Sequence, residues 1–184
     1  MRMTKMLATA AFVTGAAFQL SGCATSASST AMTVAPQPAA AAEKPFPPPL
    51  QHAMCVRAVT GGEETNPLWV SKVDNKGFQD ALNASLDGAG LSAGSGTCAY
   101  SIDVNLLGLS QPAIGFSYTV TSHVNYKVYD ASGQPYLLAT IDAPYTATMS
   151  DSFFGVERMR LANEGSIRAS IQDFLDKLRE GPQQ

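Results

Sequence analysis

Basic clusters, histidines and cysteines are all scarce in this 184-residue chain, and each scarcity argues against a class of function. The sequence holds 12 Lys and Arg residues against 15 acidic ones, for a formal net charge of −3. Binding to nucleic acid phosphates needs clustered Lys and Arg, and no such cluster is present. Two histidines and three cysteines leave little for metal chemistry. We therefore expect no nucleic acid partner, no metal site and no cofactor.

The apolar stretch near the N-terminus is too short to cross a membrane. It runs over residues 6–20, whereas a spanning helix needs about 20 residues. Arg2 and Lys5 precede it, and Leu20-Ser21-Gly22-Cys23 ends it. A positive start, a short apolar core and small residues at the end are typical of a secretory signal peptide. This pattern predicts that residues 1–22 are a signal peptide.

The cysteine that follows points to lipidation. Leu20-Ser21-Gly22-Cys23 resembles the bacterial lipobox, whose cysteine thiol accepts a diacylglycerol. Two or more acyl chains, such as palmitate, anchor a protein stably on a membrane, whereas one chain binds only marginally. We expect Cys23 to carry the lipid anchor. Ala24, in place of Asp, resembles the enterobacterial signal for the outer membrane, so we expect the periplasmic face of that membrane, with the inner membrane as the alternative.

Residues 23–54 are predicted to form a disordered tether. The stretch is rich in Ala, Ser and Thr and contains six prolines. Proline fixes φ and lacks a backbone donor, which disfavours regular structure. As a flexible chain the stretch would span about 30 Å. We interpret it as a spacer between the lipid and the domain.

Residues 55–180 are predicted to form one globular α+β domain. Alternating apolar and polar residues mark strands that begin near Cys55, Tyr100, Tyr118 and Leu137. Helical periodicity marks residues 74–87 and 156–179. The order β-α-β-β-β-α predicts a two-layer α/β sandwich, a mainly antiparallel sheet of about four strands with two helices on one face. The patterns leave the order of the strands open.

Local features refine the last predicted helix. Asp151 or Ser152 can cap its start, because short polar side chains satisfy the free N–H groups there. Glu164 and Arg168 stand four residues apart, a spacing at which opposite charges attract on a helix surface. We expect an ion pair there, and a second one between Asp173 and Lys177, which have the same spacing.

Cys55 and Cys98 are predicted to form a disulfide. Both would lie in an oxidising compartment, where such bonds persist. Each opens a predicted strand, and the helix between them makes those strands parallel. A bridge needs neighbouring strands with Cα atoms about 4.4–6.8 Å apart. Buried free thiols are the alternative.

No residue stands out as catalytic. The segment 90–94 matches the G-x-S-x-G pattern, but it follows a helix and precedes a strand, the reverse of the context that a serine hydrolase needs. A general base needs an orienting partner and a nucleophile, and no spacing in the sequence places either beside His123. Asp103 and Asp142 share its polar sheet face, but nothing sets their register. We interpret Glu63-Glu64 as solvated loop charge rather than metal ligands.

Three groups of residues give the chain a family resemblance. They are Val59-Thr60-Gly61-Gly62 with 66–70 and 78–86, Gly115-Phe116 with 119–121 and 124–126, and Phe154-Gly155-Val156-Glu157-Arg158 with 160–165. On these residues the chain resembles a family of small, uncharacterised proteobacterial lipoproteins. The resemblance implies an envelope lipoprotein and no particular chemistry. Some members are named sugar acyltransferases, but acyltransferases acting on UDP-N-acetylglucosamine resemble β-helices of hexapeptide repeats, which this sequence lacks.

These observations favour a non-catalytic accessory or binding domain of the cell envelope, with an envelope protein as its partner. One alternative is an enzyme acting on envelope glycan or lipid. Another is a binder of a small apolar ligand, which would require a sizeable cavity between sheet and helices.

Two apolar turns are candidates for the partner contact. One follows the strand that starts at Tyr100, and the other precedes the last helix. Strand directions put both turns at one end of the sheet, opposite the end where the tether enters at Cys55. We therefore predict an apolar tip that points away from the membrane; in the alternative, its aromatics close the core. The tip consists of Pro112, Ile114, Phe116, Phe153 and Phe154.

Overall fold

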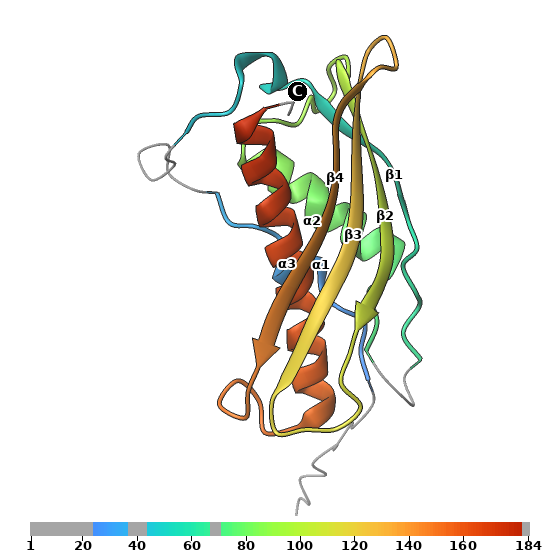
Figure 1. Ribbon diagram of the computed structural model, residues 1–184, viewed down its shortest axis with the longest axis vertical. Coiled ribbons are helices and arrows are strands. Elements are labelled where there is room, and N and C mark those ends of the chain that lie inside the picture. The colour runs from blue at the N-terminus through green and yellow to red at the C-terminus, as the bar shows by residue number, and fades with distance from the viewer. Residues whose placement is uncertain (1–23, 37–43, 67–70, 182–184) are drawn as a thin grey trace, which may run out of the picture.

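The domain is a four-stranded sheet with its long helices on one face, as Figure 1 shows. The computed structural model describes residues 24–36, 44–66 and 71–181. The predicted α+β sandwich and its β-α-β-β-β-α order are confirmed. The elements of the domain are β1 (Met54–Thr60), α2 (Asn75–Gly88), β2 (Tyr100–Ser110), β3 (Tyr118–Asp130), β4 (Pro135–Ala147) and α3 (Gly155–Glu180).

The strands lie in sequence order, β1-β2-β3-β4. β1 runs parallel to β2, and the remaining neighbours are antiparallel. This arrangement follows from the connections, because α2 returns the chain between β1 and β2 whereas short turns join the others. α2 packs on β1, and α3 packs on β3 and β4. The opposite face of the sheet is open to water.

Tyr126 joins the sheet to both helices at the centre of the core. Its ring stacks on Phe174 of α3, with centroids 4.3 Å apart, and meets Phe78 of α2 edge-on at 6.5 Å. Its hydroxyl shares a hydrogen bond of 3.0 Å with Ser170. Complete burial raises the pKa of Tyr126, because the apolar surroundings disfavour the phenolate.

The two long helices begin in different ways. Asp74 caps α2 as its sequence predicts, and its carboxylate accepts the Gly77 N–H at 2.7 Å. Phe154 occupies the N-cap position of α3 and makes no side-chain cap, so the prediction that Asp151 or Ser152 caps α3 is wrong. Asp151 is engaged instead by the backbone N–H of Thr148, at 2.7 Å, which turns it away from the helix.

The predicted disulfide between Cys55 and Cys98 is confirmed. The two Cα atoms lie 5.6 Å apart. The condition set by the sequence is met, because β1 and β2 are hydrogen-bonded neighbours and both cysteines lie at the end where these strands begin. The bond closes that end of the sheet covalently.

The prediction of a disordered tether is wrong for residues 24–36 and 44–53, here called the docked segment. It contains the short helices α1 (Ser29–Met32) and η2 (Pro48–Leu50), and Met32 and Leu50 are fully buried. The Val34 N–H donates to the Ser85 hydroxyl at 3.0 Å. A few apolar side chains of this Ala- and Pro-rich segment are thus part of the hydrophobic core. Residues 37–43 and Cys23 lie outside the described part of the chain.

The docked segment runs along α3 from its first half to its end. The Ser28 N–H donates to Glu164 at 2.7 Å, and the Ala31 carbonyl accepts from Arg168 at 2.6 Å. Further on, Lys44 donates to the carbonyl of Glu180 at 3.2 Å. The chain therefore enters the domain near the start of α3 and crosses to the other end of the sheet before β1 begins, as the blue and teal ribbon of Figure 1 shows.

This path corrects two predictions. Glu164 and Arg168 do not form the predicted i,i+4 pair, and Arg168 donates to the Ala31 carbonyl instead. Glu164 is only 2% exposed, and it bonds to Arg160 at 2.5 Å and to the docked segment. The entry point of the chain is also not at the end opposite the tip, because the docked segment doubles back over the helices. The blue start of the described chain lies in the same half of the molecule as the two apolar turns (Figure 1).

Candidate functional site

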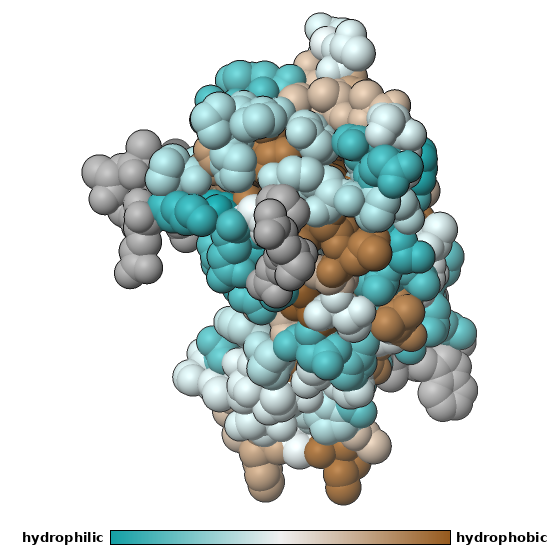
Figure 2. Space-filling view, turned by 45° about the horizontal axis from the view of Figure 1, so that its top comes forward, coloured by the Kyte–Doolittle hydropathy of each residue, from teal (hydrophilic) through white to brown (hydrophobic). Residues whose placement is uncertain are grey.

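The apolar tip is the most exposed hydrophobic feature of the described residues. Ile114 is 88% exposed, Phe116 80%, Phe153 76% and Phe154 66%. Pro112 is half-buried beside them. The alternative, in which these aromatics close the core, is therefore wrong. Figure 2 shows the apolar side chains as two brown protrusions at the lower end of the molecule.

Arg158 holds the second turn of the tip in place. Its Nη1 donates to the carbonyls of Ser152 and Phe153, at 2.9 and 2.8 Å. Its guanidinium lies over the ring of Tyr118, 5.2 Å from the centroid, at the point where β3 begins. The residue itself is 6% exposed. Phe153 therefore projects into water from a turn that is fastened to the sheet.

The tip carries almost no charge. Residues 111–117 contain no acidic or basic side chain, and residues 148–154 contain only Asp151. Hydrogen bonds from the backbone and the hydroxyl of Thr148 lower the pKa of Asp151, so this carboxylate remains charged but is directed into its own turn.

The open face of the sheet carries a row of polar side chains that the sequence analysis did not place together. His123 Nδ1 lies 2.7 Å from Asp142 Oδ1, and His123 Nε2 lies 2.9 Å from the Ser110 hydroxyl. The register explains the contact, because His123 pairs directly with Asp142 across β3 and β4. His123 is on the polar face of the sheet as predicted, and its partners come from the strand register rather than from spacing in the sequence. Asp103 is not part of this row, since it pairs with Arg57, whose hydrogen bond lowers its pKa.

The order of these contacts matches a Ser-His-Asp relay, but the setting does not. Such a relay needs preorganised donors for an oxyanion in a site that excludes water. Asp142 and His123 stand on an exposed sheet face. The backbone N–H groups around them serve the strand ladder. The row therefore fits a cross-strand polar network better than an active site.

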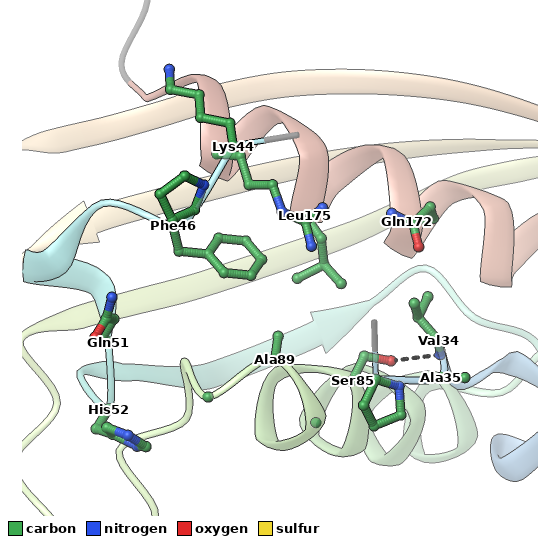
Figure 3. Close-up of a pocket in the computed structure, with 15 residues that line it drawn as sticks. Val34, Ala35, Lys44, Phe46, Gln51, His52, Ser85, Ala89, Gln172 and Leu175 are labelled. Carbon is green, nitrogen blue, oxygen red and sulfur yellow. Dashed lines mark hydrogen bonds between the residues drawn. The ribbon is translucent and has the colours of Figure 1, made fainter. Parts of the chain in front are cut away.

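A cavity of about 280 Å³ lies between the docked segment and the ends of α2 and α3, as Figure 3 shows. Phe46 and Leu175 face each other across it, and Arg179 stacks over the Phe46 ring at 4.3 Å. The Ser85 hydroxyl is already used by Val34 and the carbonyl of Ala81. The cavity does not lie between sheet and helices, where the small-ligand alternative required it, and it is at the lower limit of about 300 Å³ for ligand sites.

The remaining candidate residues lie in loops. The Ser92 hydroxyl accepts the Gly94 N–H at 3.2 Å, as in a Gly/Ser turn. Glu63 forms an exposed ion pair with Lys72 at 3.2 Å. Within the described ranges, no three His, Cys, Asp or Glu side chains gather as metal ligands would.

None of the helices in the described residues combines the length and apolar character that crossing a membrane requires.

Comparisons with known proteins identify the fold but not a family. No family model matches the chain, and no curated protein matches it. A solved structure from Xanthomonas campestris, described under the family name DUF330, is 11% identical with a TM-score of 0.55, covering 80% of this chain and 91% of that one. At this identity the similarity establishes a shared fold alone.

Two further structures are more distant. A Caulobacter crescentus protein, provisionally described as a lipoprotein, is 14% identical with a TM-score of 0.43, over 55% of this chain and 80% of that one. A hypothetical protein from Chlamydia trachomatis is 10% identical with a TM-score of 0.48, over 70% and 96% of the two chains. Scores this low support no inference about function.

Proposed function

We propose that this chain is a lipid-anchored accessory domain of the bacterial cell envelope that works by contact rather than by catalysis. The lipobox at Cys23 and the signal-like residues 1–22 support export and acylation. Ala24 supports sorting to the periplasmic face of the outer membrane. The disulfide between Cys55 and Cys98 is compatible with an oxidising compartment.

The observation that carries the contact function is the exposure of four large apolar side chains on two turns, one of which Arg158 holds against the sheet. Fully burying a side chain such as Ile114 or Phe116 gains roughly 1.5–3 kcal/mol. A monomeric domain in water forgoes that gain at each of the four positions. Exposed apolar groups gathered at one place typically mark an interaction site. The tip is therefore the contact surface of this domain.

Photo-crosslinking in intact cells tests the contact function. A photoreactive amino acid at position 114 should give adducts with a neighbouring envelope component. The matched control is the same amino acid at position 138, because Leu138 is also exposed but lies beside the turn at the opposite end of the sheet. If positions 114, 116 and 153 gave no more adducts than position 138, the contact function would be wrong.

Ester hydrolysis is a second candidate function, favoured by the Ser110–His123–Asp142 row alone. Purified protein should be assayed against acyl esters beside Ser110→Ala and His123→Gln. Under the contact function we expect no hydrolysis that depends on Ser110. Hydrolysis by the natural sequence that both substitutions abolish would establish the enzyme and displace the proposal.

A further inference from the structure

We infer that the tip docks on a lipid bilayer, namely the membrane that holds the Cys23 anchor. The inference rests on the proposed function, because it takes the tip as the contact surface, and it names what that surface meets. The domain would stand on the membrane with its sheet upright, so that the two apolar turns enter the headgroup region. The sequence alone predicted the reverse orientation.

The first argument is the position of the anchor. The Ala27 N–H donates to the carbonyl of Lys72 at 3.1 Å, and the next residue, Ser28, bonds to Glu164. These bonds fix the start of the docked segment on the domain. Cys23 precedes Ala27 by four residues, so even a fully extended chain keeps the two Cα atoms within about 14 Å. The acyl chains are therefore attached close to this fixed point.

The second argument is that the tip starts from the same place. The carbonyl of Ser71, next to Lys72, accepts from Asn163 at 2.8 Å and from the side-chain amide of Gln111 at 3.4 Å. Gln111 directly precedes the first turn of the tip, and Ile114 lies at most about 11 Å further along the chain. Anchor and tip thus extend from one hydrogen-bonded junction.

The opposite end of the domain is out of reach of the anchor. β3 has 13 residues, and a strand of that length extends for about 43 Å. The turn that joins β3 to β4 lies beyond it. An anchor held within about 14 Å of Ala27 is therefore closer to the tip than to that turn.

The third argument is the chemistry of the tip. Amphipathic elements that lie in the membrane interface bury large apolar side chains about 5–10 Å deep, and Phe is typical among them. The tip offers three Phe and one Ile, with one charge directed inward. Its two separate protrusions (Figure 2) differ from the continuous surface of about 800 Å² that each partner of a typical protein complex buries. A fluid surface accommodates separate protrusions, whereas a protein partner would need matching pockets.

The anchor and the tip have different tasks in this arrangement. Multiple acyl chains already retain the protein on the membrane. Because the tip is then held near the surface, even weak insertion is favoured by the high local concentration of lipid. The tip therefore orients the domain rather than adding to its retention.

A site-specific label measures the orientation. Cys23 is acylated in the proposed mature protein, and Cys55 and Cys98 are bonded to each other, so Ile114→Cys introduces the one reactive thiol. The lipidated protein carrying an environment-sensitive fluorophore there is reconstituted into vesicles of phosphatidylethanolamine and phosphatidylglycerol. Phe153→Cys provides a second position on the tip, and Leu138→Cys is the matched exposed control.

We expect spin-labelled lipids to quench positions 114 and 153 at least threefold more strongly than position 138, with a blue-shifted emission at the tip only. Equal quenching at all three positions would overturn the inference. Thermal melting of each labelled variant verifies that the fold is intact.

The two proposals fail in different ways. If the tip stayed in water on pure lipid vesicles while position 114 still gave protein adducts in cells, the contact function would stand and the bilayer inference would fall. If position 114 gave neither lipid nor protein adducts in cells, the contact function itself would be wrong.

Discussion

The turns at the two ends of the sheet differ in what they leave exposed to water. At one end, the turn between β3 and β4 satisfies its own polar groups: the Asp130 carboxylate accepts from the Ser132 hydroxyl at 2.6 Å and from the N–H groups of Ser132 and Gln134, both at 2.9 Å. At the other end, the turns of the tip leave Ile114 and Phe116 in water. The β3–β4 turn needs no further contact, because its own side chains satisfy its polar groups. The turns of the tip would gain free energy by burying their apolar side chains against another surface.

Among the changes that separate the roles of the two ends, we expect the largest effect from removing the anchor. Under the lipoprotein proposal, Cys23→Ala should abolish acylation and the cut before residue 23, because it removes the thiol that would accept the lipid. The protein should then accumulate at precursor size, which immunoblotting of membrane fractions detects. Cys23→Ala protein of mature size in the outer-membrane fraction would contradict the lipoprotein proposal.

Removing the disulfide should weaken the end opposite the tip. The bond joins residues 43 positions apart, and releasing a loop of that size costs about 4 kcal/mol of stability by the loop-closure relation. We expect Cys55→Ala with Cys98→Ala to lower the free energy of unfolding by about that amount, measured with urea. Reducing agent should destabilise the natural protein equally and leave the variant unchanged. No loss in either experiment would mean that the bond is absent in the purified protein.

Loosening the docked segment tests whether its packing keeps the anchor close to the tip. Met32, on the docked segment, is fully buried where that segment packs on α2 and α3, and Met→Ala changes in cores cost roughly 2–5 kcal/mol. We expect Met32→Ala to lower the melting temperature and to weaken lipid quenching at position 114. Ala35→Ser, at an exposed position of the same segment, is the control. Unchanged quenching in a destabilised Met32→Ala protein would show that the docked segment does not set the orientation.

A smaller effect on stability is expected from changing Asp130 in the turn between β3 and β4. Hydrogen bonds from the Ser132 hydroxyl and from Gln134 lower the pKa of Asp130. Their contribution to stability is present above the ordinary carboxyl pKa and is lost as the pH falls through the lowered folded value. Asp130→Ala should therefore melt slightly lower than the natural protein at pH 7, and the two should converge in acid. A difference that persisted below the lowered pKa, where Asp130 is protonated, would assign the effect to packing instead.

The smallest effect on stability is expected at the tip itself. Because Ile114 is 88% exposed, Ile114→Asp should change the free energy of unfolding by no more than about 0.5 kcal/mol. The same substitution should reduce photo-crosslinking at position 116. A large drop in melting temperature would show that the tip is structural.

Local patterns in the sequence were sufficient to predict the strands and long helices. Alternation around Val124 and Tyr126 separates a buried from a wet face, and Asp74 marks the start of α2 by a cap. The disulfide could be predicted only on the condition that β1 and β2 are neighbours, which the sequence left open. The exposure of Ile114 could also be predicted, because it stands between Pro112 and Gly115 at a turn and has little core to reach. For Phe116, Phe153 and Phe154 the sequence left burial in the core as an alternative.

Contacts between distant segments could not be predicted in this way. The pairing of His123 with Asp142 depends on strand register, and a shift of one residue would place the two side chains on opposite faces. The docked segment has neither helical nor strand periodicity, so Met32 and Val34 looked like isolated apolar residues in a spacer. Their burial depends on the space between α2 and α3, which exists only once the domain has folded.

The docked segment also determines how the domain responds to a pulling force. A load applied at the proposed anchor would reach the bonds of Ala27 to Lys72 and of Ser28 to Glu164 first, and would then separate the segment from α2 and α3 contact by contact. The β-sheet, which starts at residue 54, would bear no load until the whole segment had come free. The released chain of residues 24–53 has a contour length of about 100 Å. The segment would therefore extend under load. While it is packed it holds the domain close to its anchor point, and once released it would let the domain move far from the lipid surface.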